Sequence, residues 1–269
     1  MINILLPTDF SQNAQDAADF VFELFDSKSI RIHLMHAVVP PRSAPGMMIN
    51  IADLMLKDAE KDLEKEKDRL IESYPEAANN IEAHAKLGYL MDVIPTLCKS
   101  KNIQLIVMGT LGENDIASKI LGSNTEQIIR KAFAPVLAVP SGFEVSDHPK
   151  ICIATAKDHI PHTETLESMF SRLKEQHHVN LSVLHVLVSE SDKALKSIKF
   201  NGMQIGVDVE TADSAEEGIN KHLVAEPYDM LVVCHRHNSR IDYLFRRSTT
   251  KKLAGDIQVP LMIIPAEKE

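Results

Sequence analysis

Short apolar runs alternate with longer segments of helical spacing along the first half of the chain. Ile, Val and Leu dominate the apolar runs, whereas the segments between them are rich in strong helix formers. Near-continuous apolar strands that alternate with helices are typical of a parallel sheet covered on both faces. We expect strands at Ile4–Leu6, Ile32–Ala37, Ile81–Ala85, Leu105–Met108 and Val136–Val139, and the clearest helix over Asn50–Tyr74.

Four landmarks of this pattern recur in the same order in the second half of the chain. The spacing between the second and the last landmark is about 24 residues shorter there, a loss that loops and crossovers tolerate better than core strands do. We therefore place the deletion in the connection after the second strand. The matching stretches are Ile4–Leu6 with Ile151–Ile153, Ile32–Val39 with Leu181–Val188, Gln104–Gly109 with Met230–His235, and Ala134–Pro140 with Val259–Pro265.

A polar, turn-rich stretch separates the two copies. It reads GFEVSDH over residues 142–148 and has the composition of a linker. The fold class that we expect is therefore α/β, with two tandem doubly wound domains at residues 1–141 and 149–269.

Composition and charge exclude several classes of protein. The net charge is −9 and only 5% of the residues are aromatic, so neither phosphate neutralisation nor base stacking is supported and we expect no nucleic-acid partner. No apolar stretch approaches the ~20 residues that span a bilayer, so we expect no membrane span. Three separated cysteines without a CxxC pair, and a start without a signal peptide, favour a cytoplasmic protein.

A glycine-rich window follows the fourth expected strand. Gly109, Gly112 and Gly122 have the spacing G-x2-G-x9-G, and Ser123 follows directly. Glycines at the carboxyl end of a parallel strand let the backbone approach a phosphate, and a helix that begins at Ser123 would offer free N–H groups to an anion. The alternative needs no ligand, because Ser123–Glu126 also reads as a capping box and the glycines can serve a turn.

Taken together, these stretches resemble the universal stress protein family. The resemblance rests on LLPTDFS at residues 5–11, LMHAV at 34–38, LIVMG at 105–109, the glycine spacing and the closing APVLAVP. It implies five parallel strands in the order 3-2-1-4-5 in each domain and, for members with the full glycine motif, ATP binding. By this resemblance Asp9 and the main chain of Ala37 hold the adenosine. The other expected site residues are Pro7 and Thr8 beside the adenosine, and Met108, Gly109, Gly112, Gly122, Ser123 and Asn124 along the ribose and phosphates.

The second copy departs from the motif at each matching place. His235 and Asn238 stand where the first copy has Gly109 and Gly112, Arg247-Ser248 replaces Gly122-Ser123, and Asp158 lies two residues late for the carried-over aspartate. Side chains in place of glycines would block the approach of the backbone to phosphate, so we expect a degenerate site. A basic cluster around Arg247 is more simply a solvated helix face. The run Cys234–His237 lacks a second cluster at zinc spacing, so we expect no metal site there.

Three functional hypotheses remain open. The first is a stress-response regulatory protein that binds ATP or another adenine nucleotide with little or no hydrolysis, Mg²⁺ being implied only by triphosphate chemistry. The second is a slow ATPase or nucleotidyl enzyme, although the glycine window offers no obvious general base, no arginine finger and no P-loop lysine; Asp115 and Lys119 are near, but no catalytic residue is assigned. The third is a scaffold that binds no nucleotide and presents a surface to an unknown protein partner.

The closing strands of the two copies are expected to pair with each other. Val136–Val139 and Leu261–Ile264 are the last strands of their sheets, and exposed edges tend to be paired or covered. By the family resemblance, this pairing makes an intramolecular pseudo-dimer. A homodimer of the whole chain through other faces stays an open alternative.

Overall fold

The computed structural model describes residues 1–40, 48–110, 123–131, 134–155, 164–189, 192–200, 203–234 and 259–265. The strands are β1 (Ile2–Pro7), β2 (Ile30–Val38), β3 (Ile81–Leu87), β4 (Leu105–Gly109), β5 (Val136–Val139), β6 (Lys150–Thr155), β7 (Asn180–Leu187), β8 (Ser197–Phe200), β9 (Met203–Thr211), β10 (Met230–Cys234) and β11 (Leu261–Ile264). The helices are α1 (Gln12–Leu24), α2 (Met48–Ser73), the 3₁₀ helix η1 (Pro75–Asn80), α3 (Leu90–Ser100), α4 (Ser123–Lys131), α5 (Glu164–Gln176) and α6 (Ala215–Ala225).

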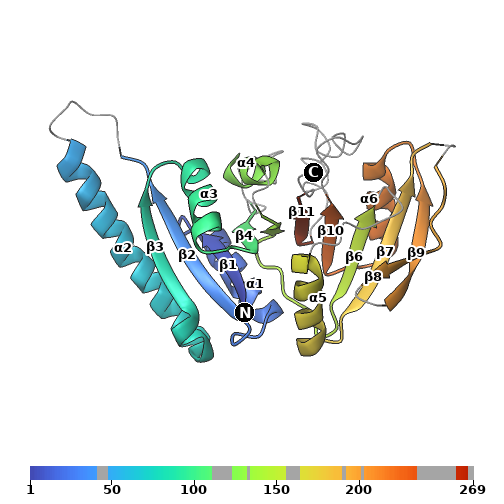
Figure 1. Cartoon of the computed structure of the whole chain (residues 1–269), viewed down its shortest axis with the longest axis horizontal. Coiled ribbons are helices and arrows are strands. Elements are labelled where there is room, and N and C mark those ends of the chain that lie inside the picture. Colours follow the sequence, from blue (N-terminus) through green and yellow to red (C-terminus); the bar gives the residue numbers. More distant parts are fainter. Residues whose placement is uncertain are drawn as a thin grey trace.

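The described strands form one 11-stranded sheet in the order β3-β2-β1-β4-β5-β11-β10-β6-β7-β9-β8 (Figure 1). The first half therefore has the order 3-2-1-4-5, which confirms the expected doubly wound topology. The same order holds in the second half for β9-β7-β6-β10-β11. The expected pairing of the closing strands is confirmed, because β5 and β11 pair with each other, antiparallel, and join both halves into a single sheet.

The shorter second copy lacks a crossover helix. In the first half α2 connects β2 to β3, whereas in the second half β7 is followed by β8 and β9, which pair antiparallel. The deletion therefore lies in the connection after the second strand, as the spacing predicts. A hairpin takes the place of the helix, so the described part of the second half has six strands, one more than the expected five.

Helix α2 has one buried and one solvated side. Ala59, Leu63 and Leu70 are buried at spacings of four and seven residues, which places them on one face. The charged face carries ion pairs three residues apart, such as Lys65 with Asp62. This spacing brings side chains together on a helix surface, so the paired charges line the solvated side of α2.

An ionic network fixes α2 against α1. The Arg69 guanidinium donates to both carboxylate oxygens of Asp19 at 3.0 and 3.1 Å and to Glu66, whose other carboxylate oxygen accepts from Gln15. Burial raises the pKa of Asp19, and the arginine opposes that shift. The two helices that cover the same face of the first half are therefore held by charge as well as by packing.

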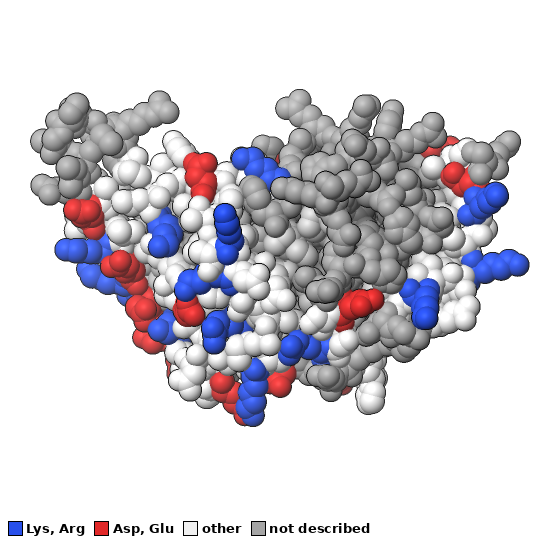
Figure 2. Space-filling model, viewed as in Figure 1, with Lys and Arg blue, Asp and Glu red and all other residues white. Residues whose placement is uncertain are grey.

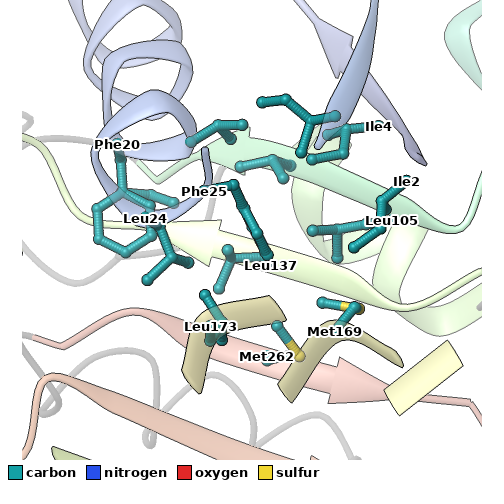
Figure 3. Packing of buried hydrophobic residues seen from close by; sticks show 14 of the residues in the cluster. Ile2, Ile4, Phe20, Leu24, Phe25, Leu105, Leu137, Met169, Leu173 and Met262 are labelled. Atoms are coloured by element: carbon teal, nitrogen blue, oxygen red, sulfur yellow. The ribbon is translucent and has the colours of Figure 1, made fainter. Parts of the chain in front are cut away.

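One hydrophobic cluster crosses the junction between the halves. Figure 3 shows Phe20 and Leu24 of α1 and Leu137 of β5 facing Leu173 of α5 and Met262 of β11. These five side chains are each at most 2% exposed. Because burial of a large apolar side chain stabilises by roughly 1.5–3 kcal/mol, the shared cluster binds the halves much more strongly than the three backbone pairings of β5 with β11 alone would.

The described surface carries mixed charge. On the face shown in Figure 2, Lys and Arg side chains are interspersed with Asp and Glu. Within the described ranges, no helix has both the length and the apolar character of a membrane span.

Cutting the connection between the halves should leave them associated. A protease site introduced near Ser146 breaks the chain in an exposed turn and leaves the β5–β11 ladder and the shared cluster intact. The cleaved protein should elute from a sizing column under native conditions as one species. As a control, Leu137→Asp places a charge in the shared cluster, and its cleaved form should separate. Separation of the cleaved parent protein would contradict the shared core.

Candidate functional site

β1 and β4 stop pairing before their carboxyl ends, and this is the point in the sheet where the strand order reverses. β1 pairs with β2 as far as Pro7–Met35, but its ladder with β4 covers Ile4–Leu105 and Leu5–Ile106. In open α/β sheets, ligands bind in the crevice outside the carboxyl ends of the strands at such a switch point. The expected site residues Pro7, Thr8 and Gly109 all lie at this edge of the sheet.

The loop after β1 is anchored to β2 through Thr8. The Thr8 N–H donates to the Met35 carbonyl at 2.8 Å, and the Thr8 carbonyl accepts from His36 Nδ1 at 2.7 Å. The Thr8 hydroxyl accepts from the Phe10 N–H at 2.9 Å, which closes a tight turn. The backbone that carries the next residue, Asp9, therefore has a fixed direction.

Asp9 is exposed and supports the start of α1 without capping it. Its Oδ1 accepts from the Ser11 N–H at 3.1 Å and from the Ser11 hydroxyl at 2.5 Å. Ser11 is the N-cap, because its hydroxyl accepts from the Ala14 N–H. Ser11, and not Asp9, therefore caps this helix. Within the described residues, the second carboxylate oxygen of Asp9 makes no hydrogen bond, so it is available to a ligand hydroxyl.

Sequence reasoning missed the role of Phe10 in this loop. Phe10 has a φ of +65°, which is rare for a residue with a side chain, and its ring lies 4.7 Å from the ring of His36. Backbone strain of this kind persists where surrounding contacts over-determine it, and it clusters at functional sites. The sequence offers a signal in retrospect, because Thr8 and Phe10 come directly after β1 and His36 lies near the carboxyl end of the neighbouring β2.

Ala37 presents its main chain beyond the end of β1. Met35 bonds toward β1 through its carbonyl, whereas the Val38 carbonyl accepts from Gly88 on the β3 side. Because successive residues of a strand direct their N–H and C=O groups to opposite sides, the groups of Ala37 point the same way as those of Met35. β1 ends at Pro7, so no described strand residue pairs with Ala37 on that side.

Thr125 links α4 to the end of β4. Its buried hydroxyl donates to the Gly109 carbonyl at 3.2 Å, and the next backbone N–H, that of Thr110, donates to Val139. The N-terminus of α4, where Ser123 and Asn124 lie, is therefore fixed close to Gly109. The structure brings these three expected residues together at the crevice edge, although the loop between Thr110 and Ser123 is outside the described residues.

The structure supplies its own reason for Gly109 to be glycine. A Cβ on Gly109 would lie 2.3 Å from the Asn13 carbonyl oxygen in α1, a distance that backbone atoms cannot accommodate without a shift. Close approach of α1 therefore requires this glycine whether or not a phosphate lies nearby. The contact with Asn13 is enough to explain the glycine at position 109, without the phosphate expected from the sequence.

The remaining expected residues differ in what the structure says of them. Met108 is buried in the cluster on the α3 and α4 side of the sheet, so its side chain is part of the core, whereas Asn124 is exposed at the first turn of α4. Gly112 and Gly122 lie outside the described residues, as do His235, Asn238, Arg247, Ser248 and Asp158 of the second copy.

An open, doubly wound sheet with a polar loop at its switch point defines a class of ligand-binding α/β proteins. The universal stress protein family profile matches residues 1–140, about half of the chain, and the chain belongs to this family. Universal stress protein MJ0577 of Methanocaldococcus jannaschii is 26% identical over 151 residues, which cover 51% of this chain and 93% of that protein.

Two solved structures extend the similarity to both halves. A universal stress protein from Archaeoglobus fulgidus aligns over 98% of each chain with a TM-score of 0.66 and 17% identity. The protein PA1789 of unknown function from Pseudomonas aeruginosa aligns over 98% of this chain and 92% of its own, with a TM-score of 0.58 and 12% identity. The tandem arrangement is therefore a fold shared with other proteins.

Replacing Gly109 should destabilise the protein independently of any ligand. Gly109→Ala brings a methyl group against the Asn13 carbonyl, and overpacking of this kind costs about 1–3 kcal/mol. Gly206→Ala in β9 is the matched control, because a Cβ there has no neighbour within 4 Å. Urea denaturation without nucleotide should show the loss for Gly109→Ala alone. Equal stability of the two variants would show that α1 does not require the glycine.

Proposed function

We propose that the first half of this chain binds one adenine nucleotide at the crevice between β1 and β4 and acts as a regulatory protein. The observation that carries the proposal is that the main-chain edge of Ala37 is open and the carboxylate of Asp9 exposed, both beyond the point where β1 ends. These groups lie at the place where open α/β sheets take ligands. Family membership supports the proposal, since the expected adenosine residues come from the family resemblance.

The two ends of the crevice suit different parts of a nucleotide. Adjacent N–H and C=O groups at Ala37 complement the alternating acceptors and amino donor of an adenine edge. A carboxylate such as that of Asp9 accepts hydrogen bonds from ribose hydroxyls. Across the crevice, the first turn of α4 at Ser123 and Asn124 offers backbone N–H groups and a positive dipole end to phosphates.

The other expected residues complete this proposal. Pro7 and Thr8 form the floor beside the adenosine, and the backbone at Met108 and Gly109 borders the ribose. Gly112 and Gly122 are proposed to let the loop approach the phosphates. ATP is the expected ligand, with ADP and AMP as alternatives, and Mg²⁺ enters only with a triphosphate.

The residue types in the glycine-rich window after β4 favour a regulatory role over a catalytic one. Phosphoryl transfer requires a positioned base and charge stabilisation by Lys, Arg or a metal, and the stretch from Gly109 to Asn124 has no P-loop lysine at the required spacing. Burial raises the pKa of the Cys98 thiol to about 11 and that of Cys152 to about 12. Neither of these thiols is therefore a thiolate nucleophile at neutral pH. A cytoplasmic location and a protein partner stay predictions.

Nucleotide binding should depend on Asp9. Calorimetric titration of the whole chain with ATP and Mg²⁺ should give one site, and Asp9→Asn should weaken it about tenfold or more, since a hydrogen bond to a charged group contributes about 1.5–3 kcal/mol. The control is Asp26→Asn. Asp26 is also exposed and also accepts the N–H two residues later, but it lies beyond the far end of α1.

Two further variants, Gly122→Val and Arg247→Ala, and an analysis of the nucleotide carried by the purified protein complete this test. Gly122→Val should abolish binding if the loop backbone approaches the phosphates, and chromatography of a denatured extract of the purified protein should identify the nucleotide carried. Two equivalent sites, or a site that survives Gly122→Val and responds to Arg247→Ala, would place the ligand in the second half. Absence of any binding would favour the scaffold hypothesis.

Hydrolysis of bound ATP should be slow. The first-half loop supplies backbone amides and hydroxyls and no assigned base, so turnover should lie well below the enzyme median of about 10 per second. Release of labelled phosphate under saturating ATP measures it. A rate of several per second that is lost in Ser123→Ala would overturn the regulatory proposal.

A further inference from the structure

Three potential metal ligands converge between β2 and β3, away from the crevice. His33 of β2 lies opposite Glu82 of β3 in the ladder, and His84 follows Glu82 on the same face of β3. His33 precedes Ala37 by four residues, about 13 Å along the strand, so the cluster is separate from the proposed nucleotide site. Sequence reasoning missed this cluster, because its members come together only when the register of β2 with β3 is known.

The spacing of the three donor atoms suits a tetrahedral metal ion. His33 Nδ1 lies 3.1 Å from His84 Nε2 and 3.6 Å from Glu82 Oε2, and His84 Nε2 lies 3.8 Å from the same carboxylate oxygen. Zn²⁺ bonds of 2.0–2.2 Å in tetrahedral geometry separate neighbouring donors by about 3.3 Å. Each observed distance is within about half an ångström of that value, so small side-chain shifts would bring all three atoms onto one ion.

A hydrogen-bonded histidine pair alone does not account for this arrangement. At most one proton lies between His33 Nδ1 and His84 Nε2, and it makes one hydrogen bond between the two rings. The nearby Glu82 carboxylate oxygen can only accept, so it brings a third lone pair and no further donor. Within the described residues, His33 Nε2 is buried without a hydrogen-bond partner, so the pair does not form a closed polar network. Three lone-pair donors that face one point are what a cation requires.

The protonation states of the three groups also suit a cation. Burial lowers the pKa of His33 to about 4 and also lowers that of His84, so both imidazoles are neutral near pH 7. The Lys101 ammonium, which donates to Glu82 Oε2 at 2.7 Å, lowers the pKa of that carboxyl group. Two neutral imidazoles and a carboxylate form a ligand set known from zinc sites with one open coordination position.

Lys101 and Glu82 connect the cluster to solvent. The His33 side chain is 2% exposed and that of His84 12%, whereas the side chains of Glu82 and Lys101 are 40% and 36% exposed. A metal ion can therefore reach the cluster from the Glu82 side. The lysine places a positive charge there already, so it competes with the ion for the carboxylate.

The second half closes the corresponding position with a tyrosine. Ser182 lies beside Cys152 in the ladder of β6 with β7, as His33 lies beside Leu5 in the ladder of β1 with β2. The Ser182 hydroxyl donates to the Tyr228 hydroxyl at 3.1 Å. The Tyr228 hydroxyl therefore occupies this region of the second half, where it donates to Glu226 Oε2 at 2.9 Å and bonds to His222 Nε2 at 2.8 Å.

We propose that His33, Glu82 and His84 form a binding site for a divalent transition-metal ion, with Zn²⁺ as the best match, and that the ion joins β2 to β3. The fourth coordination position faces solvent on the Glu82 side. This assignment is independent of the proposed nucleotide function, because the ligands belong to the chain and none lies at the crevice.

Metal titration of the whole chain tests the site. Protein freed of metal with a chelator, and without nucleotide, is titrated with Zn²⁺ against a chromophoric competitor, and then with Co²⁺. One tight site should appear, and bound Co²⁺ should show the strong visible absorption of tetrahedral coordination. His84→Ala and Glu82→Gln should each weaken Zn²⁺ binding by at least about 100-fold, since even loss of an outer-shell partner costs 10–100-fold.

Two variants distinguish this site from surface binding. Lys101→Met should tighten Zn²⁺ binding about two- to fivefold, the equivalent of one exposed ion pair. His178→Ala should leave binding unchanged, because His178 and His148 form an exposed histidine pair without a described carboxylate ligand. Absence of a tight site, or a site that survives both His84→Ala and Glu82→Gln, would overturn the proposal. If His84→Ala does not fold, Glu82→Gln decides, because its side chain is largely at the surface.

Discussion

The antiparallel pairing of β5 with β11 is the interaction on which the rest of the architecture depends. Each of these strands would otherwise be an exposed edge of its own sheet, and Leu261–Ala138, Met262–Leu137 and Ile263–Val136 remove both edges at once. The pairing also brings α1 of one half against α5 of the other, so the apolar faces of both helices lie in one cluster. A single half would lose the partners of Leu137 and Phe20 across the junction, and exposure of a large apolar side chain at roughly 1.5–3 kcal/mol is a substantial fraction of the usual 5–15 kcal/mol of net stability.

The hydrophobic pattern and the family resemblance together predict the sheet. The pattern predicts its class, and the resemblance predicts its strand order. Alternation of Ile4–Leu6, Leu105–Met108 and the helical segments requires a parallel α/β sheet, and the strand order follows from family likeness. The β8–β9 hairpin is not predictable in this way, since a deletion in a connection shows only that a crossover is shortened. Pairing of the two closing strands is expected because exposed strand edges tend to be paired. The apolar cluster that the two halves share depends on their three-dimensional arrangement, and no local sequence pattern indicates it.

The candidate site residues also fall into two groups, those that the sequence predicts and those that only the structure brings together. Thr8 and Asp9 are reached through the family resemblance, and Gly109 also through its place in the glycine window at the carboxyl end of β4. Gly109 is found for an incomplete reason, because the approach of Asn13 from α1 is a tertiary contact. His33 and His84 are 51 residues apart and meet through strand register, and a shift of one residue in that register would direct the two side chains to opposite faces. Such a cluster is visible in a structure and hidden in a sequence.

The two halves differ in the polar groups that they expose and in how they close their sheets. The first half has an exposed carboxylate at Asp9, an open main chain at Ala37 and a Phe10 backbone in a left-handed conformation that costs stability. The second half has shed the α2 crossover and closes the position opposite Cys152 with Ser182 and Tyr228. Because both halves share one cluster, the second can stabilise the first without a ligand of its own. A duplicated domain that keeps its packing face can therefore lose a crossover helix, whereas loss of the packing face would expose the core of both halves.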